Sequence, residues 1–145
     1  MIVYLDTSAF VPLFVAEPST QLCQDLWNMA DDVFSVRSLR VETAAALAQA
    51  QRLGRISEDA LAKLLEAMNE QLKQIRVIEL DDTLARAVAD AACQHALRGY
   101  DAVHFAAAAA LPTENLVAVS GDRALLTAWQ TIGLTTADTS FPPGH

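Results

Sequence analysis

Short apolar runs separated by longer helical segments constrain the fold of this chain more than any other feature of its sequence. They lie at residues 2–5, 33–36, 77–80, 116–119 and, as a short last strand, 134–137. Such runs are typical of parallel strands, because helices cover both faces of a parallel sheet. The alternation of strands and helices predicts a single α/β domain over residues 1–145, with a doubly wound parallel sheet.

Cap and breaker residues mark the expected helices between these strands. Ser, Thr and Asp are preferred at helix N-caps, while Gly and Pro commonly follow helix ends. These signals predict a first helix capped by Thr7 or Ser8. The helix that ends at Leu97 is expected to be capped by Asp82 or Thr83. The remaining helices are expected at 19–30, 39–53, 57–74, 100–111 and from the turn 120–122 to about 132, ahead of a tail that ends in FPPGH.

Composition and charge argue against several classes of protein. The longest apolar stretch, residues 102–111, is interrupted by His104 and is shorter than the roughly 20 residues of a membrane span. The N-terminus lacks the features of a signal peptide, so a cytoplasmic protein is expected. A net charge of −8 argues against non-specific coating of nucleic acid, but it is compatible with a nuclease that has a small active cleft. Cys23 and Cys93 belong to no metal or redox motif and are expected to be buried free thiols.

Four of the 18 acidic residues stand where a charge needs an explanation. Asp6 follows the first apolar run, and Asp122 lies just beyond the run at 116–119. In an open parallel sheet, ligands bind at the edge where the carboxyl ends of the strands lie. Glu42 and Asp101 fall on helical faces that are otherwise rich in Leu, Ala and Phe, so both carboxylates are expected against the core.

Each of these acids has a simpler explanation when it is taken alone. Asp6 and Asp122 are good helix N-caps, Glu42 suits an early helical turn, and Asp101 suits a cap after Gly99. Together, however, four nearby carboxylates repel one another, and a folded protein tolerates them mainly around a divalent cation. Oxygen ligands without cysteine favour Mg²⁺ or Mn²⁺ over zinc. The four acids are therefore the candidate catalytic and metal-binding residues.

Four motifs, in this order and spacing, resemble PIN-domain proteins, specifically the VapC toxins of bacterial type II toxin–antitoxin systems. They are VYLDTSAFV, RVETAAAL, LRGYDAVHFAAA and VSGDRALLTA, and the match runs from Ile2 to about Leu134. The resemblance implies a three-layer α/β/α fold with a central, mainly parallel sheet of four to five strands. It also implies an endoribonuclease that depends on Mg²⁺ or Mn²⁺, and a VapB-type antitoxin as its partner. The family's acidic residues correspond to Asp6, Glu42, Asp101 and Asp122.

The resemblance suggests roles for neighbouring hydroxyl and arginine side chains. The hydroxyl of Ser8 is expected to orient Asp6 or a water molecule, and Thr7 and Ser120 stand in similar positions. Helix capping is the alternative for all three hydroxyls and is compatible with such roles. Two arginines that flank the last two motifs, Arg98 and Arg123, are candidate contacts to RNA phosphates, with pairing to surface acids as the alternative. Some family members carry a further acid after the fourth motif; its absence here favours one tightly held metal ion over two.

Other functions fit the sequence less well. A phosphoacceptor receiver-like domain needs an acid pair after the first strand and a lysine after the last, but Thr7 follows Asp6 and no lysine lies beyond Lys73. A PIN-like binding scaffold without catalysis stays open as an alternative, although all four acids are present. His104, one helical turn after Asp101, is expected to be a packed or surface residue rather than a base. Alanine-rich helices favour either a homodimer or close packing in the core.

Overall fold

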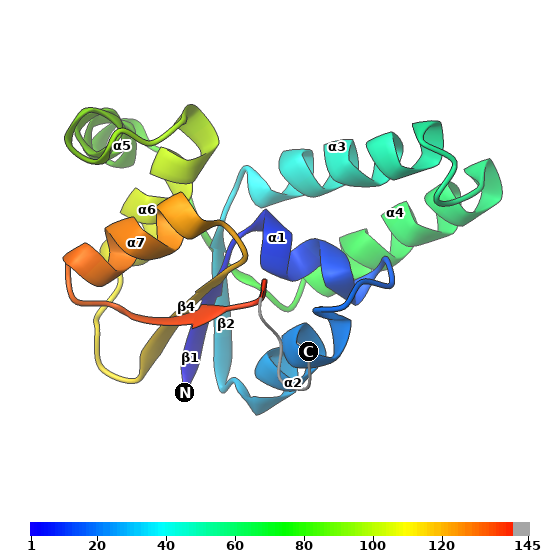
Figure 1. Cartoon of the computed structure of the whole chain (residues 1–145), viewed down its shortest axis with the longest axis horizontal. Helices are drawn as coiled ribbons and strands as arrows, with labels where there is room; N and C mark the ends of the chain where they lie inside the picture. The colour runs from blue at the N-terminus through cyan, green and yellow to red at the C-terminus, as the bar shows by residue number, and fades with distance from the viewer. Residues whose placement is uncertain (141–145) are drawn as a thin grey trace.

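The computed structural model describes residues 1–140 and has a five-stranded, fully parallel sheet at its centre (Figure 1). The FPPGH tail lies outside the described residues. The strand order is β3-β2-β1-β4-β5, so the first strand in the chain lies in the middle of the sheet. The strands are β1 (Ile2–Leu5), β2 (Asp32–Val36), β3 (Arg76–Ile78), β4 (Leu116–Ser120) and β5 (Thr135–Asp138).

Helices connect the strands as the sequence predicts. Each connection crosses over from one parallel strand to the next, which is the pattern of a doubly wound sheet. The α-helices are α1 (Thr7–Phe10), α2 (Thr20–Met29), α3 (Leu39–Arg52), α4 (Glu58–Leu72), α5 (Asp82–His95), α6 (Gly99–Ala109) and α7 (Arg123–Thr131), with a 3₁₀ helix η1 (Val11–Leu13) directly after α1. Figure 1 shows α3 and α4 side by side as a hairpin that extends away from the sheet.

Two hydrophobic cores lie on opposite faces of the sheet. Successive side chains of a strand point to opposite faces, and in β1 this sends Tyr4 to one side and Val3 and Leu5 to the other. Helices α5, α6 and α7 pack on the Tyr4 side, where Trp129 is fully buried. Helices α1 to α4 pack on the other side. The three-layer α/β/α architecture with a central parallel sheet is therefore confirmed.

The register of β1 and β4 brings the first and fourth motifs together. Leu5 is paired with Val119, and the Asp6 N–H donates a hydrogen bond to the Val119 carbonyl at 3.2 Å. Because the two strands are parallel, they end at the same edge of the sheet. Asp6 and Ser120 consequently lie beside each other, although 114 positions separate them in the chain.

Two predicted helix caps are wrong by one or two residues. Helix α1 is capped by Asp6, whose carboxylate accepts from the Ala9 N–H, and not by Thr7 or Ser8. Helix α5 is likewise capped by Asp81, whose carboxylate accepts from the Leu84 N–H at 2.8 Å, in place of Asp82 or Thr83. Asp, Ser and Thr are all good caps, so adjacent residues of these types leave the exact start undecided in the sequence.

Other boundaries also differ from the prediction. Helix α5 ends at His95 instead of Leu97, because Ala96 takes the left-handed conformation with φ 52°. Helix α6 begins at Gly99, one residue before the predicted start. Strand β3 is shorter than predicted and ends at Ile78, where its pairing with Val36 of β2 also ends.

Cys23 is buried as expected, but Cys93 is exposed on α5, so the prediction of two buried thiols is wrong for Cys93. The alanines of α6 serve the core, since Ala102, Ala106, Ala107 and Ala108 are all buried. They do not decide the predicted homodimer, which stays a prediction. No helix within residues 1–140 has the length and apolar character needed to cross a membrane.

Candidate active site

Asp6 is a buried carboxylate held by two serines from different motifs. Ser8 Oγ donates to Asp6 Oδ1 at 2.7 Å, and Ser120 Oγ donates to Asp6 Oδ2 at 2.6 Å. The Ala9 N–H adds a third hydrogen bond to Oδ1 at 3.1 Å. Burial nevertheless raises the pKa of Asp6 above its ordinary value, because desolvation outweighs these hydrogen bonds and the nearby charge of His104.

The turn after β4 is locked to the opening motif through its backbone. The Gly121 N–H donates to Ser8 Oγ at 2.8 Å, and the Asp122 N–H donates to Ser120 Oγ at 2.9 Å. A side chain at position 121 would place its Cβ 2.9 Å from Thr139 Oγ1, closer than packed atoms normally approach. A side chain here would therefore displace the Thr139 hydroxyl, while the hydrogen bond to Ser8 comes from the Gly121 backbone.

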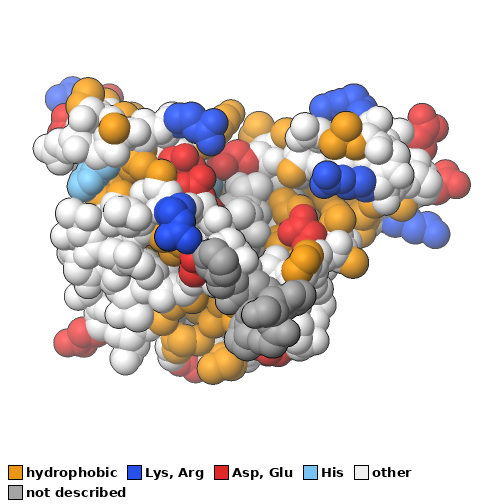
Figure 2. All heavy atoms as spheres, viewed as in Figure 1, with side chains coloured by type: hydrophobic (Ala, Val, Ile, Leu, Met, Phe, Trp, Pro, Cys, Tyr) orange, Lys and Arg blue, Asp and Glu red, His pale blue; other side chains and the backbone are white. Residues whose placement is uncertain are grey.

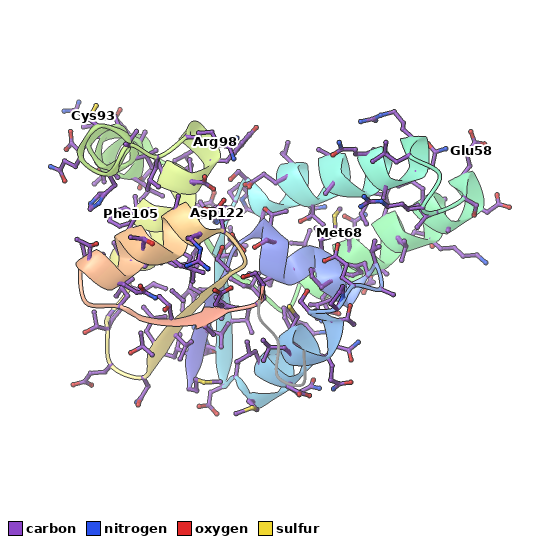
Figure 3. All side chains as sticks on the ribbon, viewed as in Figure 1. Glu58, Met68, Cys93, Arg98, Phe105 and Asp122 are labelled. Carbon is purple, nitrogen blue, oxygen red and sulfur yellow. The ribbon has the colours of Figure 1, made fainter. Side chains whose placement is uncertain are left out.

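Asp122 caps α7, as its carboxylate accepts from the Leu125 N–H at 2.9 Å. Its cap role and its place at the sheet edge are thus compatible, as they are for Asp6. Asp101 lies in the first turn of α6, where the N-cap is Arg98 and not Asp101. In Figure 3, Arg98 at the start of α6 and Asp122 before α7 lie in the same region of the molecule.

Electrostatic coupling shows that three of the four acids share one region. The Asp101 side chain is only 20% exposed, and burial is the main cause that raises its pKa. The negative charges of Asp122 and Asp6 raise this pKa further, whereas Arg98, 4.0 Å away, opposes them. The acids that follow β1 and β4 and the acid in the first turn of α6 therefore lie near enough for their charges to influence one another.

Glu42 belongs to the same region but is held differently. Its carboxylate, 11% exposed, accepts hydrogen bonds from Thr7 Oγ1 at 2.9 Å and from Ser38 Oγ at 2.8 Å. His104 Nε2 lies 3.0 Å from Glu42 Oε1 and completes the set. Burial alone would raise the pKa of Glu42, but these hydrogen bonds and the His104 charge outweigh it and leave the pKa below its ordinary value.

His104 is the residue whose place in the site the sequence does not reveal. It is packed, as expected, but it is packed against the site, with one ring nitrogen on Glu42 and the other 2.7 Å from the Tyr4 hydroxyl. Because a carboxylate only accepts, Nε2 carries the hydrogen that binds Glu42. The one available signal was its helical spacing of three residues after Asp101.

Comparison with known families identifies the family to which this chain belongs. The sequence model described as "PIN domain" matches residues 3–127, which include all four acids. The chain belongs to the PIN-domain family. Ribonuclease VapC49 of Mycobacterium tuberculosis is 36% identical over 142 residues, which cover 98% of this chain and 99% of the relative. This degree of identity places the chain with the VapC proteins among PIN domains.

Solved structures agree on the PIN fold. FitAcB from Neisseria gonorrhoeae superposes with a TM-score of 0.70 at 17% identity, over 98% of this chain and 100% of that chain. A toxin–antitoxin complex from Klebsiella pneumoniae gives a TM-score of 0.65 at 13% identity, over 94% of this chain and 97% of its own. At such low identity these two likenesses show the shared architecture.

The side chains of this PIN-domain site offer oxygen ligands that suit a hard cation, but they are not arranged to coordinate one. As the side chains stand in residues 1–140, no group of three or more His, Cys, Asp and Glu is arranged to hold a metal ion. Carboxylate and hydroxyl oxygens dominate the edge, and neither cysteine is among its donors: Cys23 is buried in the core beneath α1 to α4, and Cys93 is exposed on α5. A carboxylate has about four acceptor positions. Asp6 uses three of them, so its oxygens retain capacity for a cation.

The two arginines named as candidate RNA contacts lie on the rim of the site. The Arg98 side chain is 89% exposed beside Asp101, and Arg123 is the first residue of α7. Figure 2 shows acidic side chains near the upper centre of the view, with basic side chains above and below them. A polyanion that approaches this face meets positive charge next to the acids.

Proposed function

We propose that this PIN-domain protein is a divalent-metal-dependent endoribonuclease. The observation that carries the proposal is the coupling of Asp101 to Asp122 and Asp6, since three carboxylates in one space are an expected binding site for a cation. The 36% identity to a ribonuclease named VapC49 supports RNA as the substrate class. Oxygen donors and the lack of thiolates support Mg²⁺ or Mn²⁺.

In this proposal Asp6, Asp101 and Asp122 hold the cation. Glu42, which Thr7, Ser38 and His104 hold in place, contributes through water. The cation, when bound, lowers the pKa of water and offsets the charge that develops on the scissile phosphate. Glu42 orients the attacking water, while Ser8 and Ser120 keep the Asp6 carboxylate facing the site.

The nucleophile in this reaction is water and not a side chain. Attack at phosphorus breaks the bond to the 3′ oxygen of the preceding nucleotide, so the products carry a 5′-phosphate and a 3′-hydroxyl. No histidine is needed as the base, and His104 already has partners at both ring nitrogens.

The most direct experiment incubates purified protein with mixed RNA in EDTA, Mg²⁺ or Mn²⁺. Asp6→Asn and Asp101→Asn are compared with Asp90→Asn, which removes an exposed acid of α5 that is not one of the four candidate residues. We expect cleavage only with a divalent cation, loss of cleavage in the first two variants, and wild-type rates in the control. Cleavage in EDTA, or full activity in Asp101→Asn, would refute the mechanism.

The alternative function is a PIN-like scaffold that binds but does not cleave. The presence of all four acids argues against it. Metal binding without cleavage of any RNA offered would favour the scaffold, and the same assay therefore separates the two functions.

We also propose that the protein acts as a toxin with a VapB-type antitoxin as its partner. The VapC49 likeness and the structural likeness to a toxin–antitoxin complex support this assignment. The test is expression of the chain alone and together with a candidate VapB-type antitoxin. Growth arrest by the wild type, relief by co-expression and no arrest by Asp101→Asn are expected; arrest by Asp101→Asn would separate toxicity from the acids.

A further inference from the structure

An open cavity adjoins the acidic edge between α5 and the beginning of α6. Its volume is 690 Å³, within the range of cavities that hold small ligands. It is lined by Val88, Arg98, Gly99, Tyr100, Asp101 and Val103. Asp101 belongs both to this cavity and to the coupled acids, so a ligand bound here lies next to the proposed point of cleavage.

Tyr100 offers this cavity an aromatic ring that has no partner among residues 1–140. It is 59% exposed, and within residues 1–140 it makes neither a hydrogen bond nor a ring contact. The core aromatics differ, since Tyr4 packs edge to face on Trp129. Tyr100 directly precedes Asp101 in the first turn of α6, and both residues line the cavity.

Arg98 supplies a cation at the rim of the same cavity. Its Nε lies 4.0 Å from Asp101 Oδ2, and the arginine side chain is almost fully exposed. An exposed pair at this separation contributes little, so the guanidinium remains available to another anion. Arginine is well suited to phosphate, which its planar fork binds through two parallel hydrogen bonds.

We infer that this cavity binds an unpaired nucleobase of the RNA, stacked on Tyr100, while Arg98 holds a neighbouring phosphate. The inference rests on the proposed ribonuclease function and defines its substrate more narrowly. The bases of a duplex are already stacked on one another and do not enter such a cavity. The substrate is therefore single-stranded RNA or an RNA loop with an exposed base next to the cleaved bond.

Abasic substitutions in the substrate test this inference. The probe is a short synthetic oligoribonucleotide that spans a mapped cleavage position, with one base removed at a time on either side of the cleaved bond. The proteins are the wild type, Tyr100→Ala, Tyr100→Trp and the control Met29→Ala, which truncates an exposed side chain at the end of α2. Melting temperatures of all four proteins confirm that they fold.

At one flanking position, loss of the base is expected to lower kcat/KM of the wild type about 5- to 150-fold. Removal of the same base from the RNA has almost no further effect on kcat/KM of Tyr100→Ala, because this variant lacks the ring on which the base stacks. Tyr100→Trp and Met29→Ala respond as the wild type does. The inference is overturned if removal of a base has this effect at no position. It is also overturned if base removal lowers kcat/KM of Tyr100→Ala by the same factor as it lowers kcat/KM of the wild type.

A binding measurement separates failure of this inference from failure of the proposed function. Single-stranded RNA with 2-aminopurine at the flanking position is titrated with Asp101→Asn, and stacking on Tyr100 quenches its fluorescence. Quenching that needs Tyr100 supports the cavity even if no cleavage is found. Cleavage without this quenching overturns the cavity and leaves the ribonuclease intact. If Tyr100→Ala instead converts a dimer to a monomer in sedimentation, a second copy of the chain occupies the cavity and the inference fails.

Discussion

His104 Nε2 lies 3.0 Å from Glu42 Oε1, and this contact joins α6 to α3 across the carboxyl edge of the sheet. The Tyr4 hydroxyl from β1 binds the other ring nitrogen at 2.7 Å. The imidazole is only 3% exposed, so its position is set by packing. A buried histidine thus fixes the direction of the acid that we propose to orient water.

Replacement of His104 by alanine tests this positioning role. The change leaves the Tyr4 hydroxyl and Glu42 without a shared partner, and the free energy of unfolding is expected to fall by about 1–3 kcal/mol. In cleavage assays at saturating Mn²⁺, kcat should fall while KM changes little. His104→Gln retains a side-chain N–H donor and should recover part of kcat.

Unchanged kcat and KM in folded His104→Ala, measured below its melting temperature, would limit His104 to a role in packing. Urea unfolding of both variants provides the required stability control.

The raised pKa of Asp101 predicts an unusual pH dependence of stability in EDTA. An unfolded aspartate has a pKa of about 3.9. Between this value and the raised folded pKa, the folded protein binds more protons than the unfolded one, so Asp101 destabilises the fold as pH rises. Asparagine does not titrate. The stability advantage of Asp101→Asn over the wild type should therefore grow from pH 4 upward and level off above the folded pKa.

Thermal melts of both proteins across this pH range in EDTA check the prediction. Buried Asp6 has a raised pKa as well and contributes in the same direction in both proteins. A difference that is constant with pH would show that the pKa of Asp101 is not raised in the folded protein.

Gly121→Ala tests the contact between the fourth motif, which contains Gly121, and the first motif, which contains Ser8. The new Cβ would lie 2.9 Å from Thr139 Oγ1 and 3.6 Å from Ser8 Oγ, so the variant should lose about 1–3 kcal/mol of stability and most of its activity. Removal of the blocking hydroxyl in the double variant Gly121→Ala, Thr139→Ala should restore part of both. Gly99→Ala is the matched control, because nothing lies within 4 Å of its Cβ. Equal stability losses in both single variants would contradict the steric argument.

Thr43→Val should stabilise the protein by about 1 kcal/mol. Among the described residues, its hydroxyl is the buried side-chain polar atom that has no hydrogen-bond partner, and valine has nearly the same shape. Thr7→Val makes the same chemical change where the hydroxyl does have a partner, Glu42, and should weaken both stability and cleavage. Urea unfolding measures the free energy of unfolding of both variants against the wild type. Destabilisation by Thr43→Val would indicate that the Thr43 hydroxyl has a hydrogen-bond partner.

The sequence predicts the sheet, and the places of three of the acids on it, for a physical reason. Buried parallel strands leave continuous apolar runs, and a carboxylate directly after such a run lies at the ligand-binding edge. Asp6 and Asp122 could be located in this way, and Asp101 followed from its apolar helix. The structure brings these three together, although the metal ion itself stays a proposal.

The partners of Glu42 could not be predicted in the same way. His104 is 62 positions away, and their contact depends on how α3 and α6 pack against β1. Helical spacing placed His104 near Asp101 but did not say which face would be buried. The roles of Ser8 and Ser120 came from the motif resemblance, since local signals predict only helix caps for both. The structure shows that both donate to Asp6.

Titration of Mn²⁺ into the metal-free protein by calorimetry at pH 7 tests the central claim, that acids from β1, α6 and the turn after β4 form one cation site. Wild type and Asp90→Asn should bind Mn²⁺ with the same affinity, and Asp101→Asn should bind at least about tenfold more weakly. Equal affinity in Asp101→Asn, or no binding by the wild type with or without RNA, would contradict the claim.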